Sequence, residues 1–128
     1  KYTIITGGSY AAAYFAMLGR AFKPNATLMW PSAHAALMGP EQAATTLTMV
    51  RDNIHQREGS SWTDEEREEF KRPILRDFEA FADPYNYARH LWCDMVIEPA
   101  ETREVMALLL DLAGRTPAKP TRFGVFRM

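Results

Sequence analysis

Short apolar runs and longer segments with helical spacing alternate along the chain. Residues 1–6 are rich in β-forming side chains and end at a pair of glycines, which predicts a strand followed by a turn. Residues 27–30 and 35–38 are two further apolar runs that stop at proline or glycine, and we expect both to be short buried strands. The sequence DMVIEP, closed by Pro99, predicts one more strand.

Two helices are predicted between these strands. Ser9 is a candidate cap for a helix over residues 10–18, and Gly19 is expected to end it. A longer helix is predicted over residues 40–57, because proline suits the first turn, where its missing N–H has no partner anyway. The apolar side chains expected to face inward from it are Ala43, Leu47, Val50 and Ile54.

The second half of the chain predicts three more helices. Thr63 and Glu66 have the form of a capping box before a charged helix, and Pro73 either bends this helix or starts the next one. Asp83 precedes a short helix with the sequence YNYARHLW. The last helix carries an apolar stripe and ends at Gly114; the stripe is Val105, Leu108, Leu109 and Leu112. Alternating strands and helices predict an α/β layered domain.

Composition narrows the class of protein. A chain of 128 residues with 47% hydrophobic residues is typical of one soluble globular domain. With 15 basic and 16 acidic residues, it has no broad attraction for nucleic acid or for an anionic membrane. No apolar run reaches the roughly 20 residues that span a bilayer, and Gly7 and Gly8 interrupt the N-terminal run, which argues against a signal peptide. Because the chain begins without methionine in a core-like strand, we expect a fragment of a longer protein.

Reactive side chains give only weak signals. The single cysteine, Cys93, has no disulfide partner in the chain, which favours a reducing compartment and a buried thiol. The three histidines lie in different predicted elements without metal-ligand spacing, so we expect no metal site; they are His34, His55 and His90. Asp94 and Glu98 flank the apolar residues MVI of the predicted strand, where an acid serves either as a general base or as a cap of a loop or of the next helix.

The stretch ITGGSYAAAYFAMLGR combines a strand, a glycine turn and a helix of small residues. A helix start presents backbone N–H groups without partners, and small side chains let an anionic oxygen approach them. This is the requirement of an oxyanion hole. The same small residues also permit close packing of a helix on a sheet, so the pattern alone leaves both interpretations open.

Four segments in order resemble a known family: ITGGSYAAAYFAMLGRAF, MWPSAHAALMGPEQAA, PYNYARHLWCDMVIEPAETR and the final FGVFRM. Together they resemble the C-terminal part of the carboxyltransferase β subunit of biotin-dependent acyl-CoA carboxylases, above all the methylcrotonyl-CoA carboxylase branch with geranyl-CoA carboxylase. The resemblance implies an α/β crotonase-like (ClpP/crotonase) layered domain, partial, with C-terminal helices. Residues 1–128 would be the second crotonase-like domain of a longer two-domain subunit.

The resemblance also implies a reaction and a site. Members of this family transfer a carboxyl group from carboxybiotin to an acyl-CoA, here expected to be 3-methylcrotonyl-CoA, with geranyl-CoA or propionyl-CoA as alternatives. The backbone N–H groups of Ala12 and Ala13 would form the oxyanion hole for the biotin ureido oxygen. Ala11, Tyr14 and Phe15 would contact the substrate, and no metal is expected. Relatives usually carry GAGN or GGAY where this chain reads AAAY.

The expected partners follow from the same resemblance. They are a biotin carboxylase/carrier α subunit that supplies biotin, an acyl-CoA, and further β subunits in a homo-oligomer, with no nucleic acid or membrane. The location would be the bacterial cytoplasm or the mitochondrial matrix, and the fragment alone would be inactive. Two alternatives are a non-catalytic assembly domain, suggested by the alanines, and a biotin-independent hydratase, which the lack of an evident glutamate pair disfavours.

Overall fold

A computed structural model describes residues 1–117 of the chain. The chain divides into two compact units, residues 1–97 and a second unit that begins at Glu98. The C-terminal motif FGVFRM lies outside the described residues. Each unit is described by itself.

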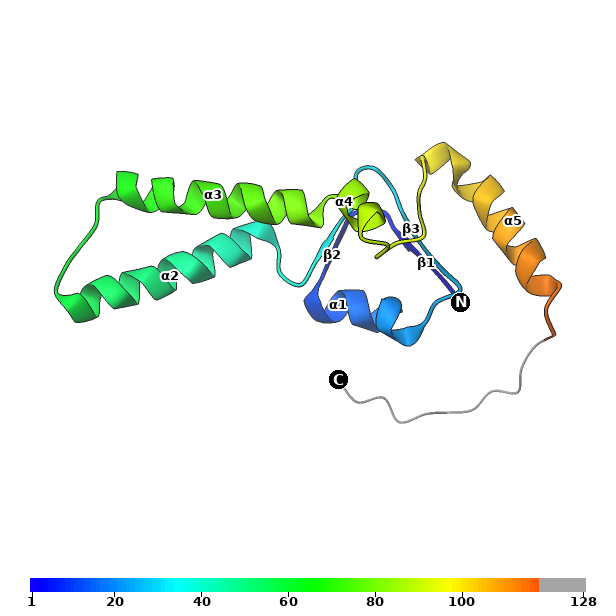
Figure 1. The fold of residues 1–128 in the computed structure, drawn as a ribbon, viewed down its shortest axis with the longest axis horizontal. Helices are drawn as coiled ribbons and strands as arrows, with labels where there is room; N and C mark the ends of the chain where they lie inside the picture. Colours follow the sequence, from blue (N-terminus) through cyan, green and yellow to red (C-terminus); the bar gives the residue numbers. More distant parts are fainter. Residues whose placement is uncertain (118–128) are drawn as a thin grey trace. The chain divides into compact units, whose positions relative to one another are not determined.

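A three-stranded parallel sheet forms the centre of the first unit (Figure 1). Its strands are β1 (Tyr2–Ile5), β3 (Ala26–Met29) and β5 (Met95–Val96), in the order β1-β3-β5. Ile5 pairs with Met29, and all four residues of β3 are buried, as expected of the central strand of a covered parallel sheet. The predicted strands near residues 1–6, 27–30 and 94–99 are thus confirmed.

A second parallel pair joins β2 (Gly8–Tyr10) to β4 (His34–Ala36). The strand predicted over residues 35–38 is confirmed with shifted bounds, whereas β2 was not predicted. Ser9 pairs with Ala35 inside the strand, so its predicted role as a helix cap is wrong. The helix α1 (Ala11–Ala16) starts after Tyr10 instead, because pairing with β4 keeps the backbone extended up to that residue.

The end of α1 also differs from the prediction. The helix stops at Ala16, and Leu18 takes the left-handed conformation (φ 71°) that commonly follows a helix end. Gly19 instead precedes a short 3₁₀ helix, η1 (Arg20–Phe22). The prediction that Gly19 ends the helix is therefore wrong by two to three residues, and glycine suits this position for a steric reason, because a Cβ there would lie 2.9 Å from the Tyr14 carbonyl oxygen.

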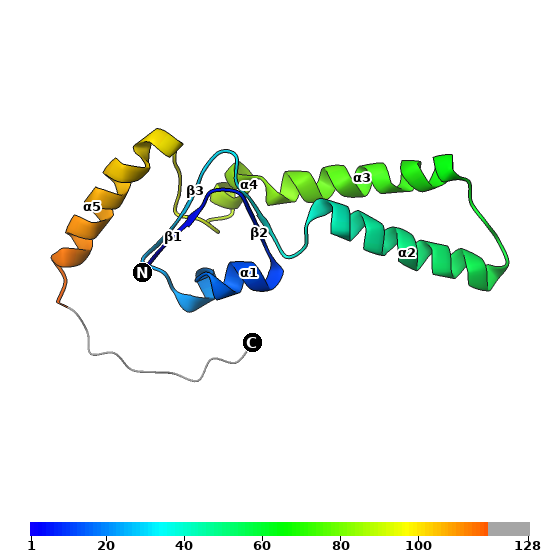
Figure 2. The same ribbon diagram turned by 180° about the vertical axis from the view of Figure 1, so that it is seen from behind.

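Two long helices, α2 (Pro40–Glu58) and α3 (Asp64–Ala82), lie side by side as an antiparallel hairpin (Figures 1 and 2). Gly59, with φ 67°, closes α2 in the left-handed conformation that glycine adopts without strain. The predicted capping box is confirmed: the Glu66 N–H donates to Thr63 Oγ1 (3.2 Å), and the Thr63 N–H donates to Glu66 Oε2 (2.7 Å). A single helix α3 continues through Pro73.

The buried face of α2 is not the one that its apolar spacing predicted. Ala43 is buried as expected, but the side chains of Leu47 and Val50 remain 42% and 51% exposed. The small residues Ala44 and Thr48 are buried instead, and the Thr48 hydroxyl donates to the Ala44 carbonyl (2.7 Å). Within residues 1–117, α2 therefore packs by its small side chains and leaves large apolar ones uncovered.

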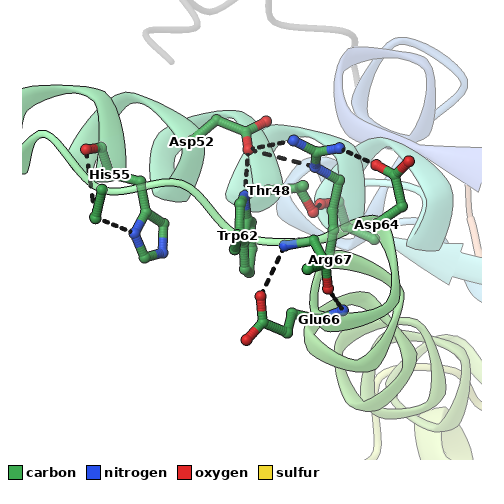
Figure 3. A network of polar contacts seen from close by, with 10 residues as sticks. Thr48, Asp52, His55, Trp62, Asp64, Glu66 and Arg67 are labelled. Carbon is green, nitrogen blue, oxygen red and sulfur yellow. Dashed lines mark hydrogen bonds and ion pairs between the residues drawn. The ribbon is translucent and has the colours of Figure 1, made fainter.

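A polar network ties together the end of the hairpin where a loop joins α2 to α3 (Figure 3). The indole N–H of Trp62 donates to Asp52 Oδ1 (2.6 Å), and the Arg67 guanidinium contacts the same oxygen (3.1 Å). Arg67 also pairs with Asp64 (2.7 Å). These contacts, led by the Trp62 hydrogen bond and followed by Arg67, hold the pKa of Asp52 below its ordinary value of 3.8.

This lowered pKa predicts how hairpin stability depends on pH. A carboxylate whose pKa is lower in the folded state stabilises the fold above its unfolded pKa, and the contribution is lost as pH falls through the folded pKa. Asp52→Asn is therefore expected to lower the urea midpoint at pH 7, with the difference from wild type vanishing in acid below pH 3.8. The measurement is urea unfolding at several pH values, with the exposed Asp77→Asn on α3 as the matched control. An equal loss at every pH would assign the effect to packing instead.

A short helix, α4 (Pro84–Arg89), follows the hairpin. The predicted helix after Asp83 is confirmed. The structure adds its cap, because the Asp83 carboxylate accepts hydrogen bonds from the N–H groups of Tyr85 (2.9 Å) and Asn86 (3.1 Å). The main buried cluster joins α4 to the strands and the segments that follow them; it comprises Ile5, Met29, Ala33, Ala35, Tyr87 and Cys93.

The second unit contains a 3₁₀ helix, η2 (Pro99–Glu101), and the helix α5 (Thr102–Gly114), which confirms the last predicted helix. Of its predicted stripe, Val105 and Leu109 are partly buried, whereas Leu108 and Leu112 are exposed. In the part of the chain that the structure describes, no helix has the length and apolarity needed to cross a membrane.

Candidate functional site

The candidate site lies where β2 and β4 end. Ala11 directly follows the last residue of β2, and Leu37 directly follows the last residue of β4. Because the two strands are parallel, their carboxyl ends meet at the same edge, the usual place for ligands in α/β sheets. A hollow of about 140 Å³ opens there, lined by Ala11, Tyr14, Phe15, Ala36, Leu37 and Tyr87.

Three predicted substrate contacts thus come together. Ala11, Tyr14 and Phe15 all line the hollow from α1. Tyr14 and Phe15 meet edge to face, with ring centroids 5.6 Å apart, and the Tyr14 hydroxyl accepts a hydrogen bond from the Arg20 N–H (3.2 Å). These contacts hold the Tyr14 ring in place beside the hollow.

The predicted backbone donors, Ala12 and Ala13, are the second and third residues of α1. The N–H groups of a first helical turn have no acceptor inside the helix. The side chain of the preceding residue, Tyr10, makes no capping hydrogen bond, and no acidic side chain lies in the first turn. Both alanines are exposed and lie in sequence between Ala11 and Tyr14, which line the hollow, but neither alanine is itself a lining residue.

Ala11 has a strained backbone. Its φ of 49° lies in the left-handed region, which costs a residue with a side chain about 1–2 kcal/mol. Strain of this kind is concentrated at functional sites, where the surrounding structure enforces it. The strain therefore marks the junction between β2 and α1 as a constrained position.

Ala11→Gly is expected to raise the free energy of unfolding by about 1 kcal/mol, because glycine adopts a positive φ without the steric cost. Urea unfolding measures the change. The matched control is Ala16→Gly at the other end of the same helix. It is expected to lower the free energy of unfolding by about 0.5–1 kcal/mol, because glycine gives the unfolded chain more conformational entropy to lose on folding. Equal losses in both variants would contradict the strain at Ala11.

Tyr87 reaches the hollow from α4 and was not singled out from the sequence. Its side chain is only 8% exposed, and burial, with smaller contributions from Tyr14 and Cys93, raises its pKa to about 12. The hydroxyl therefore keeps its proton across the physiological range. No local pattern identifies this residue, because the long α2–α3 hairpin separates α4 from β4 in the sequence.

The other sequence candidates have structural roles. Cys93 is free and buried, and burial raises its pKa, so the predicted buried thiol is confirmed. The Asp94 carboxylate accepts the Thr27 N–H (2.7 Å), and its own N–H donates to the Thr27 carbonyl (2.8 Å), so it ties β3 in place. Glu98 forms a capping box with Glu101. Among residues 1–117, no three His, Cys, Asp or Glu side chains are grouped to hold a metal ion.

Known proteins are similar to this chain in sequence. The family described as "Carboxyl transferase domain" matches residues 1–125. The chain is 45% identical over 128 residues to the mitochondrial methylcrotonoyl-CoA carboxylase beta chain of Arabidopsis thaliana, covering 100% of this chain and 22% of the relative. It is 42% identical over 128 residues to the biotin-dependent 3-methylcrotonyl-coenzyme A carboxylase beta1 subunit of Mycobacterium tuberculosis, covering 100% and 24%.

Solved structures of related proteins share the fold of this chain. The crystal structure of the P. aeruginosa geranyl-CoA carboxylase beta subunit superposes with a TM-score of 0.75 at 28% identity, covering 100% of this chain and 24% of that one. The transcarboxylase 12S hexamer with hydrolysed methylmalonyl-coenzyme A gives 0.74 at 28% identity, covering 100% and 23%.

The fold is thus a mixed α/β, crotonase-like one, with helices at its C-terminal end. The chain belongs to the carboxyl transferase domain family. It spans about a quarter of the length of the relatives it matches.

Proposed function

We propose that this chain is the C-terminal crotonase-like domain of a carboxyltransferase β subunit. In the complete subunit it takes part in moving a carboxyl group from biotin to an acyl-CoA. The observation that carries the proposal is the start of α1 without a side-chain cap, where Ala12 and Ala13 lie between Ala11 and Tyr14, two residues that line a hollow of about 140 Å³. Membership of the carboxyl transferase family supports it.

The residues present fit a biotin ring. When bound, biotin supplies the carboxyl group from its ureido ring. The N–H groups of Ala12 and Ala13 donate to the ureido oxygen, and two donors at a helix start stabilise negative charge on it. The methyl groups and rings of Ala11, Tyr14 and Phe15 exclude water, which strengthens those hydrogen bonds. Backbone donors tolerate the alanines that replace the glycines of relatives.

The proposed acyl group is 3-methylcrotonyl, because the relatives at 45% and 42% identity are named for it. The apolar Phe15 in the wall of the hollow is compatible with a branched acyl group. Geranyl-CoA is the competing substrate, since the geranyl-CoA carboxylase beta subunit shares the fold; propionyl-CoA is the third.

The proposed partners are an α subunit that carries biotin and further β subunits. Relatives are named beta chains or beta subunits, and the transcarboxylase 12S structure is titled a hexamer assembly. The proposed location is the mitochondrial matrix or the bacterial cytoplasm, because relatives include a mitochondrial chain and a bacterial one.

The test is reconstitution of the complete subunit with its α partner, ATP and labelled bicarbonate. Incorporation of label is measured with 3-methylcrotonyl-, geranyl- and propionyl-CoA at matched concentrations. We expect the highest kcat/KM with 3-methylcrotonyl-CoA. An assembled complex that labels none of the three would support the alternative of a non-catalytic assembly domain, and a different ranking would reassign the acyl group.

A further inference from the structure

The hydroxyl of Tyr87 is a hydrogen-bond donor without an internal partner. Within residues 1–117 it makes no hydrogen bond, although the side chain is only 8% exposed. No fully buried side-chain oxygen or nitrogen in this part of the chain is left without a partner. The Tyr87 hydroxyl must therefore reach open space, and Tyr87 lines the hollow at the end of β4.

The other residues that line the hollow offer a ligand few hydrogen-bonding groups. Four of the six lining residues have side chains that form no hydrogen bonds: Ala11, Phe15, Ala36 and Leu37. The Tyr14 hydroxyl, the other side-chain hydroxyl of the lining, accepts a hydrogen bond from the Arg20 N–H. A buried polar group without a partner is costly, and ligand sites commonly consist of an apolar wall with a few such groups. The Tyr87 hydroxyl is thus available to a ligand in the hollow.

The size and chemistry of the hollow indicate the ligand. A cavity of about 150 Å³ accommodates a benzene ring, so a hollow of about 140 Å³ has room for one compact ring but not for an extended chain. The side-chain polar groups of its lining are the Tyr87 and Tyr14 hydroxyls, and each can donate a hydrogen bond. A flat ring that carries acceptor oxygens on an otherwise apolar body fits these walls.

We propose that Tyr87 is a binding residue for the carboxyl donor: its hydroxyl donates a hydrogen bond to an oxygen of the biotin ureido ring in this hollow. The proposal rests on the proposed function and adds a residue from α4 to a site otherwise built from α1. Because the hydroxyl supports no contact within residues 1–117, its removal leaves the fold intact and weakens only ligand binding.

The test is Tyr87→Phe in the complete subunit. Binding of free biotin is followed by ligand-observed NMR, and initial rates are measured with free biotin as the carboxyl acceptor and a carboxylated acyl-CoA held at saturation. We expect the Kd and KM for biotin to rise three- to tenfold, the range of one neutral hydrogen bond. The KM for the acyl-CoA and the melting temperature are expected to stay unchanged.

The matched control is Tyr85→Phe, the same chemical change on the same helix at a side chain that is 60% exposed. It is expected to leave biotin binding at the wild-type level. An unchanged biotin Kd in Tyr87→Phe, a rise in the acyl-CoA KM instead, or a drop of several degrees in melting temperature would each overturn the proposal. A wild-type subunit that transfers no carboxyl group would instead refute the proposed function itself.

Discussion

Ala13→Pro in the complete subunit is expected to lower kcat for carboxyl transfer about 10²–10³-fold, the usual effect of losing one oxyanion-hole donor. Proline removes the N–H of the third residue of α1 and nothing else from the proposed hole. The first turn of a helix tolerates proline, since its N–H groups have no acceptor within the helix. The measurement is steady-state carboxylation of 3-methylcrotonyl-CoA, together with a melting curve.

The matched control for this variant is Ala13→Gly, which keeps the N–H and removes only a methyl group. It is expected to retain kcat within a few-fold. If Ala13→Pro melts near the wild-type temperature and loses less than about threefold in kcat, the Ala13 N–H does not stabilise charge in the reaction. Equal losses in the proline and glycine variants would assign the effect to the side chain.

Gly19→Ala is expected to lower the free energy of unfolding by about 1–3 kcal/mol, as overpacking of a tight site does. A Cβ at this position would lie 2.9 Å from the Tyr14 carbonyl oxygen and 2.8 Å from the Tyr14 ring. A backbone carbonyl cannot move aside as the end of a flexible side chain can. The strain would therefore pass to Tyr14, which lines the hollow, so we also expect weaker biotin binding.

Urea unfolding and biotin binding measure the two effects. The matched control is Gly7→Ala in the same unit, where a Cβ would meet no atom within 4 Å. That variant is expected to unfold within about 0.5 kcal/mol of wild type, as most surface substitutions do. Wild-type stability in Gly19→Ala would contradict the close approach of Tyr14.

Features decided by local chemistry were predicted well from the sequence. The capping box of Thr63 and Glu66, the short helix after Asp83 and the start of α2 at Pro40 were all correct. In each case, a side chain and a backbone a few residues away determine the structure. Such interactions form in the same way whatever the rest of the chain does.

Features decided by long-range pairing were not predictable. The strand β2 has only three residues and no alternating pattern, so the sequence favoured Ser9 as a helix cap, whereas its pairing with Ala35 places it in a strand. The periodicity of α2 indicated Leu47 and Val50 as inward-facing, but it could not show that the small residues Ala44 and Thr48 are the buried ones instead.

The candidate site likewise combines residues that the sequence predicted with residues that only the fold brings together. Ala11, Tyr14 and Phe15 are close in sequence and were predicted together through the family resemblance, and the structure brings them to one hollow. Leu37 and Tyr87 come from other elements and complete that hollow only after the strands pair. The roles of Ala12 and Ala13 stay predictions that Ala13→Pro addresses.

The burial of Cys93 gives the chain a built-in reporter of motion. Its thiol belongs to the same buried cluster as Tyr87, and its raised pKa keeps it protonated and slow to react. An alkylating reagent reaches it only when the corner between α4 and β5 opens. The labelling rate of Cys93, compared with and without biotin, would therefore report whether a ligand in the neighbouring hollow makes this corner more rigid.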